Sequence, residues 1–352
     1  MRSLCSPRAL FEEGAHAPCG SGSGMPVPGA HKWTLLCELG FEELWVWLAW
    51  ERSTLGFDNV EKPVIIGCVI LSAYILVMFA NLANICFIVI DKHLHQPMYL
   101  FICNLAIVDM LYCTSSCPTM IGILIVGFKT ITYLPCIFQM YSFSLGLVME
   151  VFTLSVMAFD RLIAIVKPLH YHAILTNIRS VLLTFLLWIL GFATLSIVPV
   201  TVIPLPLCSS TVKYIFCDYA AVVRTSCVDP EPYFNLMSSY TFSIMLGTFS
   251  FICLSYFKIV IVVVKMKSIG NTKKVFHTCL SHLIVIICYY GPIFMMSVIT
   301  RLGLALSLEE RNGLRIWAII GPSLVNPFVY CFRTKEIRNK ILRFVSKVEP
   351  TK

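Results

Sequence analysis

The chain has 352 residues, of which 58% are apolar and only 13% are charged. Soluble domains contain roughly 45–50% apolar and about 25% charged residues, and a water-soluble fold could not cover this much apolar surface. The formal net charge of +8 would suit a nucleic-acid binder, but the basic residues are distributed among loops between apolar stretches. The composition therefore predicts a membrane protein.

Residues 1–55 differ in composition from the rest of the chain. They contain a Ser/Gly run from Ser21 to Gly24, a turn cluster from Pro26 to Gly29, and an apolar patch from Leu44 to Trp50 between acidic residues. The patch is too short to cross a bilayer. We interpret the segment as an extracellular, disordered or interfacial extension; the alternative is an artefact of an assumed translation start. No Asn-X-Ser/Thr acceptor occurs, so N-glycosylation is not expected.

Seven later stretches are each apolar over the roughly 20 helical residues that a hydrocarbon core about 30 Å thick requires. The expected fold is all-α, a seven-transmembrane-helix bundle over residues 56–346. Its last part, 333–346, has apolar residues at helical spacing among basic ones, which predicts a short amphipathic helix on the inner leaflet. Residues 347–352 form a short cytoplasmic tail. The predicted spans are Val64–Ile90, Met98–Gly122, Leu134–Val166, Val181–Val200, Phe234–Val264, His277–Ile299 and Leu314–Phe332.

The basic residues set the orientation, because cytoplasmic loops are enriched in lysine and arginine. With an odd number of spans, the two ends of the chain lie on opposite sides, and the basic tail places the N-terminus outside, as expected at a plasma membrane. The residues assigned to the inner side are Lys92, Arg161, Lys167, Arg179, Lys258, Lys265, Lys267, Lys273, Lys274, Arg333, Lys335, Arg338, Lys340, Arg343 and Lys347. Those assigned to the outer side are chiefly Lys129, Lys213, Arg224, Arg301 and Arg311.

Four of the sixteen cysteines fall in predicted outer segments, three of them in the long loop between the fourth and fifth spans. The outer side is oxidising, so an even set of four predicts two disulfides. Four cysteines allow three pairings, and their spacing does not choose among them. The four are Cys136, Cys208, Cys217 and Cys227.

Two carboxylates lie at mid-depth in predicted spans, Asp109 in the second and Glu150 in the third. Ionisable groups inside a membrane are costly and mark functional candidates. Two acids at similar depth repel unless they share a proton or a cation. We expect a polar cluster with Asn81 and Asn326 that holds sodium or a proton; the alternative is two acids hydrogen-bonded separately.

The third span ends in the adjacent acid and base Asp160 and Arg161. From Cys136 to Arg161 a helix covers about 37 Å, enough to reach from the outer to the inner surface. The pair is either an ion pair of little energetic value or a switch for an inner partner. Pro292 and Pro327 predict kinks in the last two spans.

Six motifs occur in order over residues 57–345, and together they resemble the odorant receptor family of rhodopsin-like G-protein-coupled receptors. They are Leu94-His95-Gln96-Pro97-Met98-Tyr99, Met157-Ala158-Phe159-Asp160-Arg161-Leu162, Lys167-Pro168-Leu169-His170-Tyr171, Ser255-Tyr256, the run Lys274 to Leu283, and Asn326-Pro327-Phe328-Val329-Tyr330. A fish-type or water-soluble-odorant subgroup is one option. Leu162, Ala80 and Cys331-Phe332 depart from the common pattern and put coupling strength in doubt.

The resemblance implies a receptor that binds a small odorant and activates a stimulatory olfactory-type G protein, raising cyclic AMP. It implies the disulfides Cys136–Cys217 and Cys208–Cys227. It also assigns coupling and switching to one set of residues near the inner ends of the spans. These are Asp160, Arg161, Tyr256, Lys274, His277 and Tyr330.

The resemblance places the ligand pocket between the outer halves of the third, fifth and sixth spans. There Arg301 is a candidate for binding a carboxylate, although snorkelling or pairing with Glu309 or Glu310 explains it slightly better. The expected ligand is a small odorant, with an acidic, water-soluble one as an option. The remaining pocket candidates are Met140, Phe143, Ser144, Leu147, Tyr240, Ile244, Tyr290, Phe294 and Ser297.

Other classes fit less well. The buried acids and prolines would also suit a transporter, but no inverted repeat is evident. A receptor relic that does not signal is a second alternative. The histidines form no metal-ligand pattern, and no nucleophile and base stand at usable spacing. We therefore expect no enzyme activity, and no cofactor apart from the sodium ion.

Overall fold

The computed structural model describes most of the chain. The described residues are 53–55, 63–128, 130–208, 211–212, 216–265, 269–301 and 308–333. Nearly all of the predicted extension 1–55 and of the amphipathic helix 333–346, and the whole tail 347–352, lie outside them.

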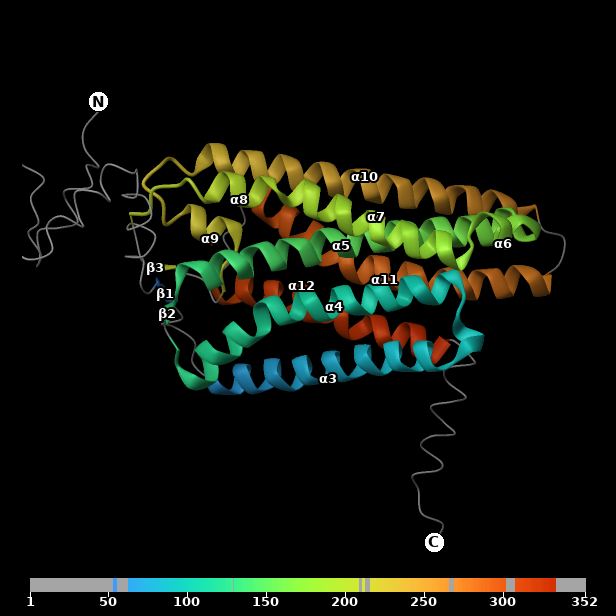
Figure 1. The fold of residues 1–352 in the computed structure, drawn as a ribbon, viewed down its shortest axis with the longest axis horizontal. Coiled ribbons are helices and arrows are strands. Elements are labelled where there is room, and N and C mark those ends of the chain that lie inside the picture. Colours follow the sequence, from blue (N-terminus) through green and yellow to red (C-terminus); the bar gives the residue numbers. More distant parts are fainter. Residues whose placement is uncertain are drawn as a thin grey trace, which may run out of the picture.

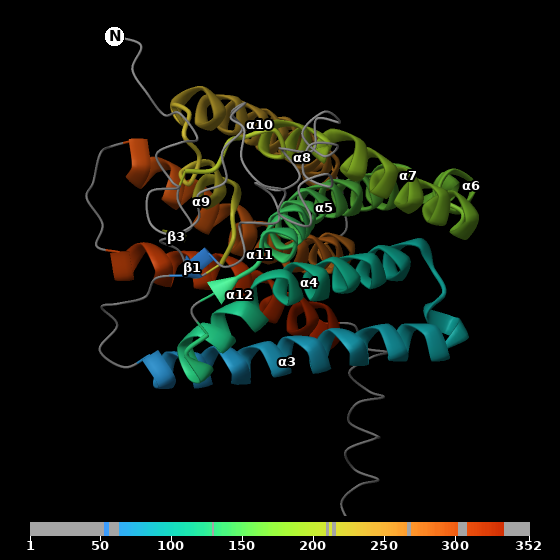
Figure 2. The same cartoon turned by 60° about the vertical axis from the view of Figure 1, so that its left-hand side comes forward.

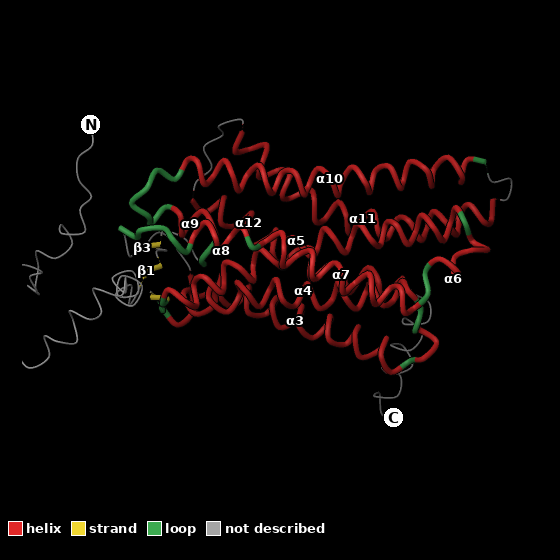
Figure 3. Tube along the Cα trace, turned by 45° about the horizontal axis from the view of Figure 1, so that its top comes forward, coloured by secondary structure: helices red, strands yellow, loops and turns green. Residues whose placement is uncertain are grey.

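Seven long helices make up the described chain, as the sequence predicts. They run alongside one another, with the connecting segments at the two ends of the bundle (Figures 1 and 3). The helices are α3 (Pro63–Ile90), α4 (Pro97–Ile121), α5 (Tyr133–Val166), α7 (Asn177–Leu195), α10 (Glu231–Val264), α11 (Ile269–Arg301) and α12 (Leu308–Arg333).

Five of these segments are long and apolar enough to cross a membrane, judged over the described residues: α3, α4, α5, α10, and α7 with its continuation. In α11 the apolar part is the shorter stretch Cys279–Met295. The most apolar window of α5 is 67% buried within the protein, against 17% in α3 and α10. The middle of the bundle is therefore formed around α5, whereas α3 and α10 turn most of their apolar surface toward lipid.

The arrangement of the helices agrees with this difference in burial. The helix α5 contacts α4, α7, α10 and α11, while α12 contacts α3, α4 and α11. Figure 2 shows α3 and α10 on opposite sides of the bundle with α5 between them. A side chain on α5 can therefore contact several other helices.

Local sequence explains where several helices begin and end. Pro97 opens α4, where its missing N–H costs nothing. The side chain of Thr176 accepts a hydrogen bond from the Arg179 N–H and caps α7. Pro118 lies within α4 and is followed by the π-helical turn η3 (Gly122–Val126), which ends at Gly127 with a left-handed φ of 77°.

Short elements gather at the end of the bundle that the sequence predicts to be outer, where Figure 1 shows the three strands together with α8 and α9. The strand β1 (Ser53–Leu55) lies between β2 (Thr130–Ile131), to which it is antiparallel, and β3 (Thr211–Val212), to which it is parallel. The helices there are α8 (Ile197–Val202) and α9 (Tyr219–Val223). At the opposite end lie η2 (Lys92–Leu94), η4 (Pro168–His170) and α6 (Tyr171–Ile174).

Candidate functional site

Two disulfides connect the outer loop to the bundle and to itself. Cys136 at the start of α5 is bonded to Cys217, and Cys208 is bonded to Cys227, with Cα atoms 5.3 and 5.0 Å apart. These are the pairs that the family resemblance implies. Gln139 adds to the connection, because its side-chain oxygen accepts a hydrogen bond from the Cys217 N–H at 2.9 Å. The outer loop is therefore held against the end of α5.

A cavity of about 230 Å³ lies under this loop. Its walls come from α4, α5, α11, α12 and the segment that leads into α9. A cavity of about 150 Å³ is large enough for benzene, so the volume suits a small organic ligand. The lining residues are Tyr112, Phe143, Leu147, Phe216, Asp218, Ile293, Arg315, Ala318 and Ile319.

Three aromatic rings form one wall of the cavity. The rings of Tyr112 and Phe143 are stacked with centroids 5.0 Å apart, and Phe216 lies 5.0 Å from Phe143 at a tilt of 53°. Gly146 allows this approach, because a Cβ atom there would lie 2.8 Å from the Tyr112 side chain. The helices α4 and α5 are thus close enough for the rings to pack.

Two charged side chains face the same cavity and pair with each other. Arg315 Nη1 on α12 donates to Asp218 Oδ2 at 2.8 Å. Asp218 Oδ1 accepts from the Ala221 N–H at 2.6 Å and so caps α9. The side chain of Arg315 is 24% exposed and that of Asp218 is 15% exposed. An acid on the outer loop is therefore joined to α12 across the cavity.

Among the predicted pocket residues whose side chains are described, two line this cavity, Phe143 and Leu147. Tyr240 and Ile244 on α10 are half-buried in the packing between helices, and the Tyr290 hydroxyl bonds to Thr248 Oγ1 at 2.7 Å. Phe294 is 71% exposed and points away from the bundle interior. Met140 and Ser144 are buried on α5, and the side chains of Ser297 and Arg301 lie outside the described part.

Sequence reasoning missed both charged residues of the cavity. Arg315 lies one residue inside the predicted seventh span, and an ionisable group within a span marks a functional candidate. That signal was present for Arg315 just as it was for Asp109. The role of Asp218 carries no comparable signal, because its contact with Arg315 joins residues 97 positions apart.

The predicted polar cluster lies deeper in the bundle. Asp109 and Glu150 are both fully buried, and the Asn326 amide donates to the two carboxylate oxygens of Asp109 at 3.0 Å each. The sequence also places Asn81 in this cluster, but its amide donates to the carbonyls of Val77 and Ser323. Asn81 thus joins α3 to α12 beside the acids.

Three oxygens of this cluster have no hydrogen-bond partner among the described residues: both carboxylate oxygens of Glu150 and the side-chain oxygen of Asn326. Glu150 lies close enough to Asp109 for the two charges to interact. Oxygen donors around a negative charge suit a hard cation, and one proton shared by the acids would also reduce their repulsion. The residues present are therefore compatible with bound sodium.

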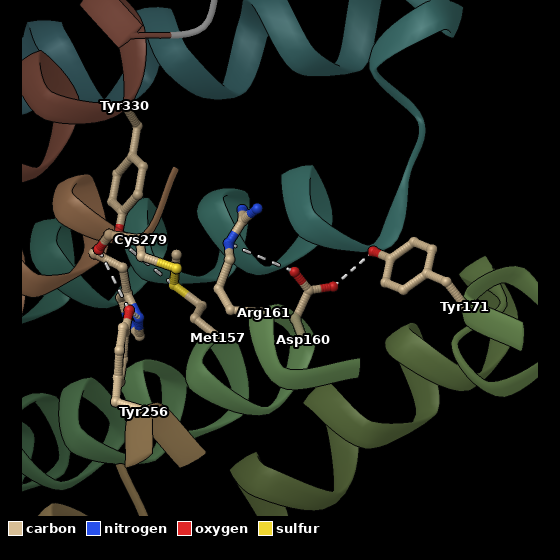
Figure 4. Close-up of polar contacts among 8 residues, drawn as sticks. Met157, Asp160, Arg161, Tyr171, Tyr256, Cys279 and Tyr330 are labelled. Carbon is tan, nitrogen blue, oxygen red and sulfur yellow. Dashed lines mark hydrogen bonds and ion pairs between the residues drawn. The ribbon is translucent and has the colours of Figure 1, made fainter. Parts of the chain in front are cut away.

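The inner end of α5 carries the predicted switch. Arg161 Nε lies 3.8 Å from Asp160 Oδ2, and the Tyr171 hydroxyl donates to Asp160 Oδ1 at 2.6 Å. Burial, and then the neighbouring Asp160 carboxylate, raises the pKa of Tyr171, so the phenol keeps the proton that it donates. Asp160 is therefore shared between the inner loop and Arg161, as Figure 4 shows.

On the other side of Arg161 lie residues from three further helices (Figure 4). The Tyr256 hydroxyl bonds to His282 Nδ1 at 2.9 Å and donates to the Cys279 carbonyl at 3.4 Å. The Tyr330 hydroxyl contacts Met157 Sδ at 4.0 Å. The structure thus brings together four predicted coupling residues. The side chains of the other two, Lys274 and His277, lie outside the described part.

The inner loop next to this cluster presents an apolar side chain to its surroundings. Leu169 is 94% exposed and borders a hollow of about 360 Å³. The hollow is also lined by Val166, Lys167, Pro168, His170 and Ile174. A single exposed apolar residue is ordinary on protein surfaces, so the hollow alone does not identify a partner.

Comparison with known proteins identifies the family. The sequence model described as "Olfactory receptor" matches residues 69–348. The olfactory receptor-like protein OLF3 of Canis lupus familiaris is 33% identical over 280 residues, 79% of this chain and 87% of the relative. Human olfactory receptor 6F1 is 31% identical over 82% of this chain and 94% of its own length. Mouse olfactory receptor 5P76 is 32% identical over 82% of this chain and 92% of its own length. The chain therefore belongs to the olfactory receptor family, whose members are multi-pass membrane receptors and not enzymes.

Proposed function

We propose that the chain binds a small odorant in the cavity under the outer loop and activates a stimulatory olfactory-type G protein at its inner face, raising cyclic AMP. One observation carries the proposal: the single helix α5 contributes to both sites. Phe143 and Leu147 line the cavity, and Asp160 and Arg161 end the same helix. From Phe143 to Arg161 the helix covers about 27 Å.

A hydrogen bond connects the cavity wall to a neighbouring helix. The Tyr289 hydroxyl on α11 donates to the carbonyl of Leu147 at 2.8 Å. A ligand that displaces Leu147 therefore acts on α11 as well as on α5. The inner part of α11 carries Cys279 and His282, which contact Tyr256 beside Arg161. Signalling would then consist of a change in how these helices pack.

The cellular placement follows from the same proposal. The receptor lies in the plasma membrane with its N-terminus and the disulfide-linked loop outside, where disulfides persist. The basic inner loops and the tail face an anionic leaflet, so membrane lipid is a further partner. Exposed Lys92 and Lys167 are described residues on that side. No nucleic acid is involved.

Asp109 and Glu150, with the Asn326 oxygen, would hold a sodium ion or share a proton in the resting receptor. The bound cation would offset the repulsion between the two buried acids. Replacement of Glu150 by glutamine removes one charge at little change in volume. We expect sodium to raise the half-maximal odorant concentration of the unmodified receptor but not of Glu150→Gln. Equal sodium dependence in the two would contradict this assignment.

A cyclic AMP assay tests the main proposal. Cells that carry an olfactory stimulatory G protein express the chain with and without residues 1–50, and surface antibody staining verifies delivery. We expect a concentration-dependent response to at least one member of a broad odorant panel. Arg161→Ala should abolish it, whereas Lys92→Ala, which removes an exposed inner cation, should not. A response that survives Arg161→Ala, or none at all from receptor at the cell surface, would overturn the proposal.

A further inference from the structure

We propose that the ligand of the outer cavity is a small carboxylic acid with an apolar body, held by Arg315. The inference rests on the proposed function and assigns a ligand class to the same site. The remaining lining side chains are Tyr112, Phe143, Leu147, Phe216, Ile293, Ala318 and Ile319, all apolar or aromatic. An ion pair within such walls provides the main polar recognition for a ligand, as one or two polar groups usually do in small-molecule sites.

The surroundings of the two charges favour an anion over an amine. Both carboxylate oxygens of Asp218 already accept hydrogen bonds, one from the Ala221 N–H and the other from Arg315 Nη1. An amine at Asp218 would lie next to the Arg315 guanidinium, which has the same charge. A guanidinium has five N–H donors in a planar fork and can bind a carboxylate bidentately. A ligand carboxylate can therefore bind Arg315 in place of Asp218.

Partial burial strengthens this recognition. Arg315 retains 24% of its side-chain exposure and Asp218 retains 15%. Charges in partly desolvated positions interact more strongly than charges at a fully exposed surface. The ligand carboxylate would thus gain a strong partner, while an alcohol of the same shape would gain only a neutral hydrogen bond.

The aromatic wall sets the size and shape of the ligand body. Tyr112 and Phe143 present rings whose centroids lie 5.0 Å apart, with Phe216 at the same distance from Phe143. The volume of about 230 Å³ holds one ring with a short chain. An acid such as 3-phenylpropanoic acid would place its ring against these residues and its carboxylate toward α12.

Because of the position of Asp218, a bound ligand acid should also change how the outer loop is linked to α12. Asp218 follows Cys217, whose disulfide reaches α5, and it caps α9. A ligand that takes Arg315 from Asp218 loosens the link between the outer loop and α12. A ligand with no charge leaves the link in place. Acids should therefore differ from matched alcohols in efficacy as well as in affinity.

The test uses the full chain and three probes of one shape: 3-phenylpropanoic acid, 3-phenylpropan-1-ol and 3-phenylpropylamine. Binding to purified receptor in lipid nanodiscs is measured by the shift in thermal midpoint with probe concentration, and cyclic AMP is measured separately in cells. We expect the acid to bind at least tenfold more tightly than the alcohol, and the amine most weakly. Arg315→Gln should remove this preference, and Arg315→Lys should retain part of it.

Two variants complete the design. Asp218→Asn keeps a side-chain oxygen for the α9 cap but removes the competing charge, so the apparent affinity for the acid should rise several-fold. Arg224→Gln is the matched control, since Arg224 lies over the ring of Phe234 and does not line the cavity. It should leave acid binding unchanged.

The outcomes separate the ligand class from the receptor function. Absence of acid binding to folded receptor, or acid binding that survives Arg315→Gln or depends on Arg301 instead, would overturn the inference. A cyclic AMP response to neutral odorants alone would also overturn the inferred ligand class, but it would support the proposed receptor function. Arg315-dependent acid binding without any cyclic AMP response would support the inference and contradict the signalling function.

Discussion

Two acid–arginine pairs in the described part of the chain lie at opposite ends of the bundle and differ in construction. The outer pair joins Asp218 to Arg315 at 2.8 Å, across 97 positions of sequence and two separate elements. The inner pair joins the neighbours Asp160 and Arg161 at 3.8 Å on one helix. The outer pair therefore connects a loop to a helix, whereas the inner pair connects nothing that the backbone does not already hold together.

The difference indicates what each pair can do. Breaking the outer pair frees the loop to move relative to α12, and a ligand in the cavity can reach it directly. Breaking the inner pair changes only which partners Asp160 and Arg161 have, and Tyr171 already competes for the acid. A local pair of this kind contributes little to stability but can be rearranged by a partner protein.

The largest effect is expected from removing the covalent support of the outer pair. Cys217→Ser breaks the disulfide to Cys136 beside Asp218. Loss of a native disulfide typically costs about 2–5 kcal/mol, so we expect a marked fall in surface delivery and thermal midpoint. Cys86→Ser, at an exposed free cysteine, is the control. Equal surface levels and midpoints for the two variants would contradict the role given to the disulfide.

A smaller effect is expected at the cavity wall. In Gly146→Ala the new methyl group would lie 2.8 Å from Tyr112 side-chain atoms and 3.0 Å from its Cα. Overpacking of this kind costs about 1–3 kcal/mol, and it displaces the ring that lines the cavity. We expect a lower thermal midpoint and weaker ligand binding. Gly247→Ala, where no atom lies within 4 Å, should be neutral or slightly stabilising; a similar loss there would remove the steric explanation.

The smallest effect is expected at the inner pair. Tyr171→Phe keeps the ring but removes the hydrogen bond to Asp160 Oδ1. The buried carboxylate then depends more on Arg161, so the pair tightens and the cyclic AMP response should require about two- to fivefold more ligand, the equivalent of roughly 0.4–1 kcal/mol. Ligand affinity measured on purified receptor should not change. Higher basal signalling from this variant would show that Tyr171 acts in the opposite sense.

The lengths of the apolar stretches alone predict the number and the approximate bounds of the long helices. Within lipid, the backbone N–H and C=O groups of each span must form hydrogen bonds with each other, which a helix provides. The helices extend beyond the predicted apolar spans where polar turns precede them. Sequence analysis starts the sixth span at His277 and the seventh at Leu314, whereas α11 begins at Ile269 and α12 at Leu308. Those first turns contain Lys273 and Glu309, which apolar length cannot detect.

The candidate site is only partly predictable, for a physical reason. Asp109 and Asn326 are recognisable as polar residues at mid-span, and they do meet. The cavity instead combines residues from five separate segments, so no local spacing identifies it. Arg315 could have been singled out as a charge within a span. Its partner Asp218 could not, because the long loop has no periodicity that predicts where it folds.

The central claim is that a ligand bound at Arg315 alters the inner pair at the far end of α5. The most direct measurement is the ¹⁹F NMR signal of 3-fluorotyrosine at position 171 in purified full-length receptor, assigned by comparison with Tyr171→Phe. Addition of 3-phenylpropanoic acid should shift this signal in the unmodified receptor and leave it unchanged in Arg315→Gln. A signal that does not respond to bound acid, or that responds equally in both proteins, would contradict the account.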